Sequence, residues 1–270
     1  MTLLIFLIIC ILLIALYILC VRGRRGHPGL AELRRWRYAH RGLHNADRPE
    51  NSMAAFRAAL DGGYGFELDI HLLKDGNLAV IHDSLLKRTT GAEGRIEDLT
   101  TEELSSYYLE GTLETIPTFQ QVLDLNGGKV PMIVELKAVD GNHAILAETA
   151  CRMLEDYDGT YCIESFDPRC VLWLKRNRPQ LIRGQLVENF VTRNKKLPWI
   201  LCFLMTHQLG NFLLMPDFIA YRFDDQKTVS NPLVRKLWGV QGVTWTVQSP
   251  QELEIAEQDG WIPIFENFLP

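Results

Sequence analysis

The sequence predicts an α/β chain: a (β/α)8 TIM barrel preceded by one N-terminal transmembrane helix. Residues 3–21 are almost entirely apolar, strand-length apolar runs then alternate with helical patterns, and polar side chains stand where many runs end. No Gly-rich dinucleotide fingerprint follows the first strand, which counts against a doubly wound sheet. At 270 residues and 47% hydrophobic, the chain has the length of one barrel.

The N-terminal run predicts a membrane anchor. Residues 3–21 carry no charge and no proline, and a membrane-spanning helix needs roughly 20 apolar residues. A cleaved signal peptide would carry positive charge before the run, whereas Arg22 and Arg24 follow it. We therefore expect an uncleaved anchor over 1–22, in contact with the lipid bilayer through residues 3–21, and a basic linker over 23–36. Because Lys and Arg stay on the cytoplasmic side, a single-pass cell-membrane protein with a cytoplasmic barrel is predicted.

Nine apolar runs have strand length, and several are continuous, as expected of parallel strands covered on both faces. They are residues 37–40, 65–73, 78–82, 131–137, 161–166, 182–187, 217–223, 242–247 and 261–265. Capping residues between the runs mark helix starts. Helices are expected from Asn51 or Ser52 to Leu60, from Thr100 or Thr101 to Tyr107, and from Asp167–Pro168 to Arg178.

Residues 199–215 are nearly as apolar as the anchor, but His207, Gln208, Gly210 and Asn211 interrupt them. A second membrane span here would divide the barrel between two strands. We expect instead a barrel helix with a wide buried face. A third interpretation is a segment that lies along the bilayer surface beside the active site.

Overall charge and cysteine spacing exclude some functions. The net charge of −5, without a run of basic and aromatic residues, argues against nucleic-acid binding. Cys10 and Cys20 lie in the apolar run, and the other four cysteines lack metal-ligand spacing, so buried thiols are expected. No protein partner is predicted.

The stretch from His40 to Asp83 is dense in chemically active side chains. Glu67 and Asp69 are one residue apart on a predicted strand, so they project to the same side. Glu135 ends another strand and can add a third carboxylate. Hard oxygen donors of this kind suit one divalent cation, Mg²⁺ or Ca²⁺.

Two histidines accompany these carboxylates. His40 and His82 each precede a charged residue at the predicted C-terminal end of a strand, which is the catalytic face of a barrel. One imidazole can protonate a leaving alkoxide while the other accepts a proton from a nucleophile, and the sequence leaves open which does which. Arg41 and Lys137 can hold a phosphate and stabilise charge in the transition state. Together these parts indicate cleavage of a phosphate ester.

Short motifs follow one another in a characteristic order. They are HRG (40–42), PEN (49–51), ExD (67–69), DG (75–76), HD (82–83), RTTG (88–91), ELK (135–137), SFDP (165–168) and WTV (245–247). In this order they resemble the glycerophosphodiester phosphodiesterase family, from Tyr38 to the C-terminus. The end departs from the family: its usual DGIITD-like strand is replaced by DGWIPIFENFLP (259–270), which puts the last strand's pocket contacts in doubt.

The resemblance implies a barrel over 37–270 that hydrolyses glycerophosphodiesters to an alcohol and glycerol 3-phosphate, in phospholipid catabolism. Residues 83–117 match a small insertion that the family places over the barrel mouth. The implied roles are acid/base catalysis for His40 and His82, metal binding for Glu67, Asp69 and Glu135, contacts with metal or phosphate for Arg41, Glu50 and Lys137, and the pocket wall for Trp245.

Two other functions stay open. A phosphatidylinositol-specific phospholipase C or sphingomyelinase D-like barrel shares the two-histidine, single-metal chemistry but cleaves lipids, and the apolar segments fit a lipid or lysolipid substrate. A membrane-tethered binding protein on a catalytically dead barrel would have lost catalytic positions, and none is lost here. The head-group alcohol, the choice of cation and the oligomeric state stay open as well.

Overall fold

The computed structural model describes residues 1–193 and 197–270. Eight parallel strands close into a barrel, because they follow the order β1-β9-β8-β7-β6-β5-β4-β2 and β1 also pairs with β2. The strands are β1 (Tyr38–Ala39), β2 (Gly65–Leu72), β4 (Met132–Leu136), β5 (Tyr161–Ser165), β6 (Arg183–Val187), β7 (Phe218–Arg222), β8 (Gln241–Val247) and β9 (Trp261–Phe265). This confirms the predicted (β/α)8 barrel.

The remaining strand, β3 (Leu78–Val80), lies outside the barrel and pairs antiparallel with the outer part of β2. The prediction that His82 ends a parallel barrel strand is therefore wrong. β2 continues beyond the barrel, and β3 returns along it, so that the Ile81 N–H donates to the Asp69 carbonyl at 3.1 Å. This return brings His82 back to the barrel mouth.

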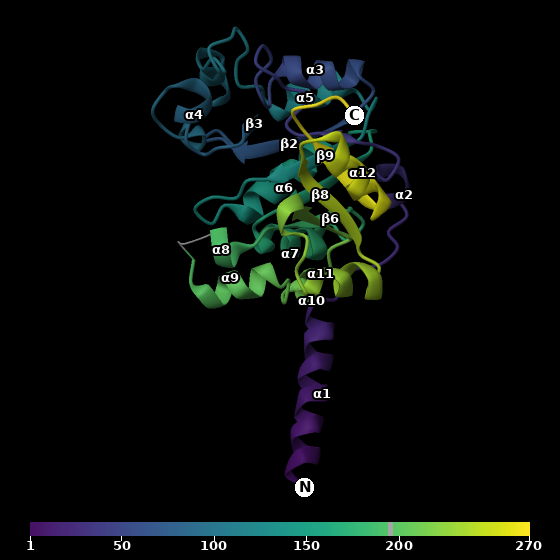
Figure 1. The fold of residues 1–270 in the computed structure, drawn as a ribbon. Coiled ribbons are helices and arrows are strands. Elements are labelled where there is room, and N and C mark those ends of the chain that lie inside the picture. Colours follow the sequence, from purple (N-terminus) through teal and green to yellow (C-terminus); the bar gives the residue numbers. More distant parts are fainter. Residues whose placement is uncertain (194–196) are drawn as a thin grey trace.

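Helices cover the outside of the barrel, while α4 (Lys87–Thr90) lies to one side, beyond β3 (Figure 1). The helices around the barrel are α2 (Leu30–Leu33), α3 (Met53–Asp61), α5 (Phe119–Asn126), α6 (His143–Leu154), α7 (Pro168–Asn177), α8 (Phe190–Arg193), α9 (Trp199–Thr206), α10 (Asn211–Leu214), α11 (Ser230–Pro232) and α12 (Pro250–Gln258). Two predicted caps are confirmed, because Ser52 Oγ accepts from the Ala55 N–H and Asp167 Oδ1 from the Arg169 N–H. The helix predicted from Thr100 is a 3₁₀ helix, Thr101–Ser106.

Side-chain alternation on β2 separates the core from the site. Phe66, Leu68 and Ile70 face the surrounding helices and belong to the main apolar cluster, whereas Glu67 and Asp69 face inward. A second apolar cluster fills the barrel below them. Residues 23–36, expected as a basic linker, contain α2, whose two leucines pack into this second cluster.

Helix α1 (Thr2–Cys20) extends away from the barrel (Figure 1). Among the described residues it is the one helix long and apolar enough to cross a membrane, a character that a signal sequence shares. Its junction with the barrel is closely bonded: Trp238 Nε1 donates to the Ile18 carbonyl at 2.8 Å, and Arg24 pairs with the buried carboxylate of Asp217. The barrel is thus held directly at the end of α1.

Residues 199–215 form two short helices, α9 and α10, joined by a turn. In α9 the buried residues are Cys202 and Thr206, while Trp199 and Ile200 are exposed. The prediction of a barrel helix with a wide buried face is therefore wrong, because α9 packs against the barrel through a narrow edge. Neither helix has the length of a membrane span.

Candidate active site

Three carboxylates meet at the C-terminal mouth of the barrel. Asp69 on β2 is in register with Glu135 on β4, and Glu67 precedes Asp69 by two residues on the same side of β2. Their oxygens lie within 4.8 Å of one another, and all three side chains are buried. Burial, then the charges of Asp69 and Glu135, raise the pKa of Glu67 well above its usual value, and burial raises that of Glu135 to about 7.

Two cationic side chains lie among these carboxylates. Lys137 Nζ is 3.0 Å from Asp69 Oδ1 and 2.9 Å from Glu135 Oε1. Arg41 Nη1 donates to Glu50 Oε1 at 2.9 Å, and Arg41 Nε is 3.4 Å from Asp69 Oδ2. Burial alone would raise the pKa of Asp69, but Lys137 and other nearby positive charges hold it well below its usual value.

The carboxylate cluster fits a hard divalent cation. Asp69 Oδ1 is buried without a hydrogen-bond partner of good geometry, although the Lys137 ammonium is near. Burial is the main cause of the raised pKa values of Glu67 and Glu135, and a cation bound between them would favour their charged forms. The three residues of this cluster offer carboxylate oxygens, which suit Mg²⁺ or Ca²⁺ rather than a soft metal.

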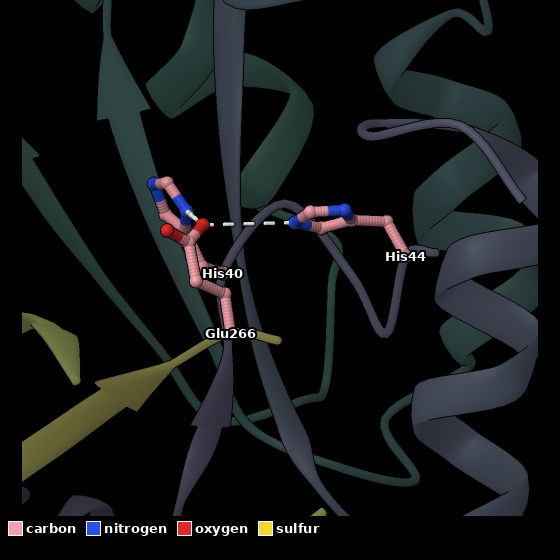
Figure 2. Close-up of side chains that lie close together, drawn as sticks. All are labelled: His40, His44 and Glu266. Atoms are coloured by element: carbon pink, nitrogen blue, oxygen red, sulfur yellow. Dashed lines mark hydrogen bonds and ion pairs between the residues drawn. The ribbon is translucent and has the colours of Figure 1, made fainter. Parts of the chain in front are cut away.

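Figure 2 shows Glu266 between His40 and His44. His40 Nδ1 is 2.6 Å from Glu266 Oε2, and His44 Nε2 is 3.7 Å from the same oxygen. The other carboxylate oxygen accepts from Gln248 Nε2 at 2.7 Å. Because Nδ1 of His40 is engaged, its Nε2 faces the carboxylates, 4.0 Å from Glu67 Oε2. Burial lowers the pKa of His40, and Glu266 opposes this by stabilising the charged ring.

His82 has a similar arrangement. Its Nδ1 lies 2.6 Å from Asp83 Oδ1, so Nε2 is again the nitrogen left for other contacts. The pKa of His82 is lowered to about 4, mainly by burial. The ring is therefore neutral at neutral pH. Its carbonyl accepts from His71 Nε2 at 3.1 Å, while His71 Nδ1 is bound to Glu97 Oε1 at 2.7 Å. These bonds fix the backbone that carries His82.

The expected insertion, residues 83–117, shares a small apolar core with Leu73, Ala79 and Ile81. Arg88 joins it to the PEN segment, because Arg88 Nη1 donates to Glu50 Oε2 at 3.0 Å. Arg88 also pairs with Asp83. Since Glu50 in turn binds Arg41, one chain of ion pairs runs from the insertion to the carboxylate cluster.

A cavity of about 610 Å³ opens beside this cluster. Its lining combines polar groups, including His82, Glu135 and Lys137, with an apolar wall. The apolar wall consists of Leu85, Leu136, Ala138, Val139 and Phe166. Trp245, expected in the pocket wall, lies outside this lining: its ring packs edge-on against Phe166 at 5.6 Å, and its Nε1 donates to the Ala220 carbonyl at 3.0 Å.

Sequence reasoning missed two acidic residues of the mouth. One is Glu266, directly after β9. The other is Glu164 on β5, which is in register with Glu135 and buried, with Oε2 unpartnered. Burial and the charge of Glu135 raise the pKa of Glu164 well above its usual value. Glu164 and Glu266 lie at or just after the C-terminal ends of strands. The same position in the sequence pattern identified Glu135.

The fold and the site together define a (β/α)8 barrel whose mouth carries a carboxylate cluster, two cations and two carboxylate-bound histidines. The model of the glycerophosphoryl diester phosphodiesterase family matches residues 40–269. The chain belongs to this family.

Individual relatives match parts of the chain. A glycerophosphodiester phosphodiesterase of Bacillus altitudinis is 48% identical over 95 residues, 33% of this chain and 38% of that protein. One of Caldanaerobacter subterraneus subsp. tengcongensis is 34% identical over 162 residues, 56% of this chain and 65% of that protein. The chain thus matches less than two thirds of the length of either relative.

A solved structure shows the same fold over nearly the whole barrel. It is a phosphodiesterase of Oleispira antarctica in complex with the product sn-glycerol-3-phosphate, with a TM-score of 0.71 and 22% sequence identity. The similarity covers 87% of this chain and 93% of that one.

Proposed function

We propose that this protein is a divalent-metal-dependent hydrolase that cleaves glycerophosphodiesters to an alcohol and glycerol 3-phosphate. The observation that carries the proposal is the cluster of Glu67, Asp69 and Glu135 beside two histidines whose Nδ1 atoms are held by carboxylates. Family membership supports it, as does the product bound to the Oleispira antarctica relative.

Glu67, Asp69 and Glu135 would hold the cation, Mg²⁺ or Ca²⁺. When bound, such a cation withdraws charge from phosphorus and offsets the negative charge of the phosphoryl oxygens. Lys137 and Arg41 add fixed positive charge for the substrate anion.

The two histidines supply the proton transfers. In His40 and His82 the carboxylate on Nδ1 leaves Nε2 as the atom that exchanges a proton. One Nε2 accepts the proton of the nucleophile, either water or a neighbouring glycerol hydroxyl, as its oxygen bonds to phosphorus. The other protonates the alkoxide as its bond to phosphorus breaks. If the glycerol hydroxyl attacks, the product of this step is a cyclic phosphate, and water must open the ring in a second step to give glycerol 3-phosphate.

We further propose that residues 1–22 anchor the enzyme in the cell membrane as a single span, with the barrel on the cytoplasmic side. α1 is apolar along its whole length, and Arg22, Arg24 and Arg25 follow its barrel end. Positive residues beside a span favour the cytoplasmic side, which sets the proposed orientation.

A lysolipid is the second candidate substrate. The observation that favours it is the apolar part of the lining of the catalytic cavity, to which Leu85, Val139 and Phe166 contribute. A glycerophosphodiester carries no acyl chain to cover such a wall. A lysolipid does.

A metal-by-substrate panel on the full chain tests the proposal. Glycerophosphocholine, glycerophosphoethanolamine and lysophosphatidylcholine are each incubated with EDTA, Mg²⁺ or Ca²⁺, and the products are identified. We expect glycerol 3-phosphate and the free alcohol from the two glycerophosphodiesters, with a cation only. His40→Ala and His82→Ala should each lower turnover by at least ~10²-fold. Preference for lysophosphatidylcholine would favour the second candidate, and absence of any hydrolysis would contradict both.

A further inference from the structure

An exposed apolar surface lies on two consecutive helices beside the junction of α1 and the barrel. We call it the α9–α10 face, and it consists of Trp199, Ile200, Leu201, Leu204, Phe212 and Leu213. Trp199 is 65% exposed, Ile200 57% and Leu213 52%. Single exposed apolar residues are ordinary on a protein surface, but a continuous set of large ones marks an interaction site.

The α9–α10 face lies on the side of the domain from which α1 leaves. α10 contacts α1, and Figure 1 shows α9 and α10 at the level of the barrel end of α1, with α9 crosswise to it. Cys202 and Thr206 hold α9 against the barrel, so Ile200 and Leu204 lie on its outer side. Because α9 lies crosswise to α1, it runs along the surface of any bilayer that α1 crosses.

The junction holds the barrel at a fixed attitude on α1. Arg24 Nη2 donates to Asp217 Oδ2 at 2.5 Å and to the Leu181 carbonyl at 2.9 Å. At Gly23 a Cβ atom would lie 2.8 Å from the Pro216 carbonyl oxygen, so the backbone there is in close contact with the barrel. Rotation of the α9–α10 face away from the α1 side would break these contacts.

Charge in this region fits a lipid surface. No Asp or Glu occurs between Glu188 and Asp217, and the charged residues of that stretch are basic. Close to the junction, the Arg22 guanidinium lies 5.3 Å from the centre of the Trp238 ring. Apolar and aromatic side chains flanked by Lys and Arg characterise helices that lie in the headgroup region, with added attraction to anionic lipids.

We infer that the α9–α10 face is seated in the boundary between lipid headgroups and acyl chains, so that the barrel rests on the bilayer along this face. The face is hollowed by a cavity of about 430 Å³, which Leu204, Phe212 and Leu213 line, giving acyl chains a recess to enter. The inference rests on α1 spanning the membrane and does not depend on the catalytic activity.

Packed aromatic side chains separate the apolar recess from the catalytic cavity. α9 contacts α8, and Phe190 of α8 lines the recess. The Phe190 ring packs edge-on against Phe166 at 6.0 Å, and Phe166 belongs to the wall of the catalytic cavity. The recess at the lipid surface and the catalytic cavity therefore share this pair of rings as a common wall.

Tryptophan quenching by brominated lipid tests the seating. The full chain is reconstituted in vesicles of phosphatidylcholine and phosphatidylglycerol, with and without brominated acyl chains, as wild type, Trp199→Phe and Trp36→Phe. Trp36 follows α2, lies outside the α9–α10 face and donates to Glu32 at 3.0 Å, so it serves as the control tryptophan. We expect Trp199→Phe to lose part of the quenched emission and Trp36→Phe to lose none.

Equal quenching in wild type and Trp199→Phe would overturn the inference, and would point to a protein partner for the face instead. A second variant, Ile200→Glu, places a charge on the outer side of α9 at a side chain that is 57% exposed and does not line the recess. It should lower the quenching that Trp199 contributes, and unchanged quenching would also contradict the seating. Since the readout is independent of hydrolysis, an inactive enzyme would leave it intact.

Discussion

His40 Nδ1 lies 2.6 Å from Glu266 Oε2, although the two residues are 226 positions apart. They meet because β1 and β9 are neighbours in the closed barrel, where the His40 N–H donates to the Phe265 carbonyl at 2.9 Å. Glu266 thereby determines which nitrogen of His40 faces the carboxylate cluster. It acts through His40 and is a positioning residue.

Glu266→Gln should lower kcat by about 10- to 100-fold with little change in KM, because the amide keeps the shape of the side chain but loses the charge that stabilises the imidazolium. The pH profile of kcat should shift as well, and Glu266→Asp should restore part of the rate. Gln248→Ala is the matched control, since it removes a neutral donor to the same carboxylate. Wild-type kcat and pH profile in Glu266→Gln would contradict the role.

Arg88 is expected to hold the mouth together through Glu50 and Asp83. Arg88→Ala should raise KM by roughly 10-fold, because a lost charge-assisted contact costs about 1.5 kcal/mol and Glu50, which binds Arg41, is then held by one cation instead of two. Steady-state kinetics on a soluble glycerophosphodiester measure this.

Arg37→Ala is the control for Arg88. It removes an ion pair between the half-exposed side chains of Arg37 and Glu257, neither of which lines the catalytic cavity, and such pairs contribute little. Equal kinetics in the Arg37 and Arg88 variants would show that the chain of ion pairs has no part in substrate binding.

His82 should make stability depend on pH. Burial lowers its pKa from 6.5 to about 4, so between these values the unfolded chain takes up a proton that the folded protein does not. Stability is therefore lost as pH falls through this window. Urea unfolding in EDTA across the window should show a steep decline for wild type and a shallower one for His82→Gln. Identical slopes would mean that His82 is not held neutral.

Arg24→Ala should destabilise the junction between α1 and the barrel. The substitution removes the ion-pair partner of the Asp217 carboxylate, which is fully buried. That carboxylate then keeps the hydrogen bond from the Arg183 N–H at 3.0 Å. Loss of one partner of a buried pair costs about 3 kcal/mol. Arg35→Ala, which removes an exposed pair with Glu32, should cost less than about 1 kcal/mol. Urea unfolding of the full chain in detergent compares them, and equal losses would contradict the importance of Arg24.

Much of the site could be predicted from sequence because its residues follow a local rule. Glu67 and Asp69 alternate on one strand, and Glu135 ends the next barrel strand, so strand geometry alone brings them together. Glu266 obeys the same rule but follows a strand where the chain departs from the family's usual closing sequence. Its contact with His40 depends on closure of the barrel, which no local pattern reveals.

The antiparallel direction of β3 could be predicted from the length of the connection that precedes it. Residues 65–73 and 78–82 are separated by a short turn containing Asp75–Gly76, with Gly76 at φ 85°. A connection this short suits a hairpin, because parallel strands need a crossover of a dozen or more residues. For residues 199–215 hydrophobicity was ambiguous, since apolar side chains are equally suited to a protein core and to a lipid surface.

Release of glycerol 3-phosphate from glycerophosphocholine, as Mg²⁺ or Ca²⁺ is added back to EDTA-treated full chain, tests the central claim most directly. Wild type should be inactive in EDTA and regain activity with the cation. Asp69→Asn, which keeps the size of the side chain but removes a ligand charge from the cluster, should stay inactive at the same cation concentration. Release that persists in EDTA, or that is equal in wild type and Asp69→Asn, would contradict a metal-dependent hydrolase built on these carboxylates.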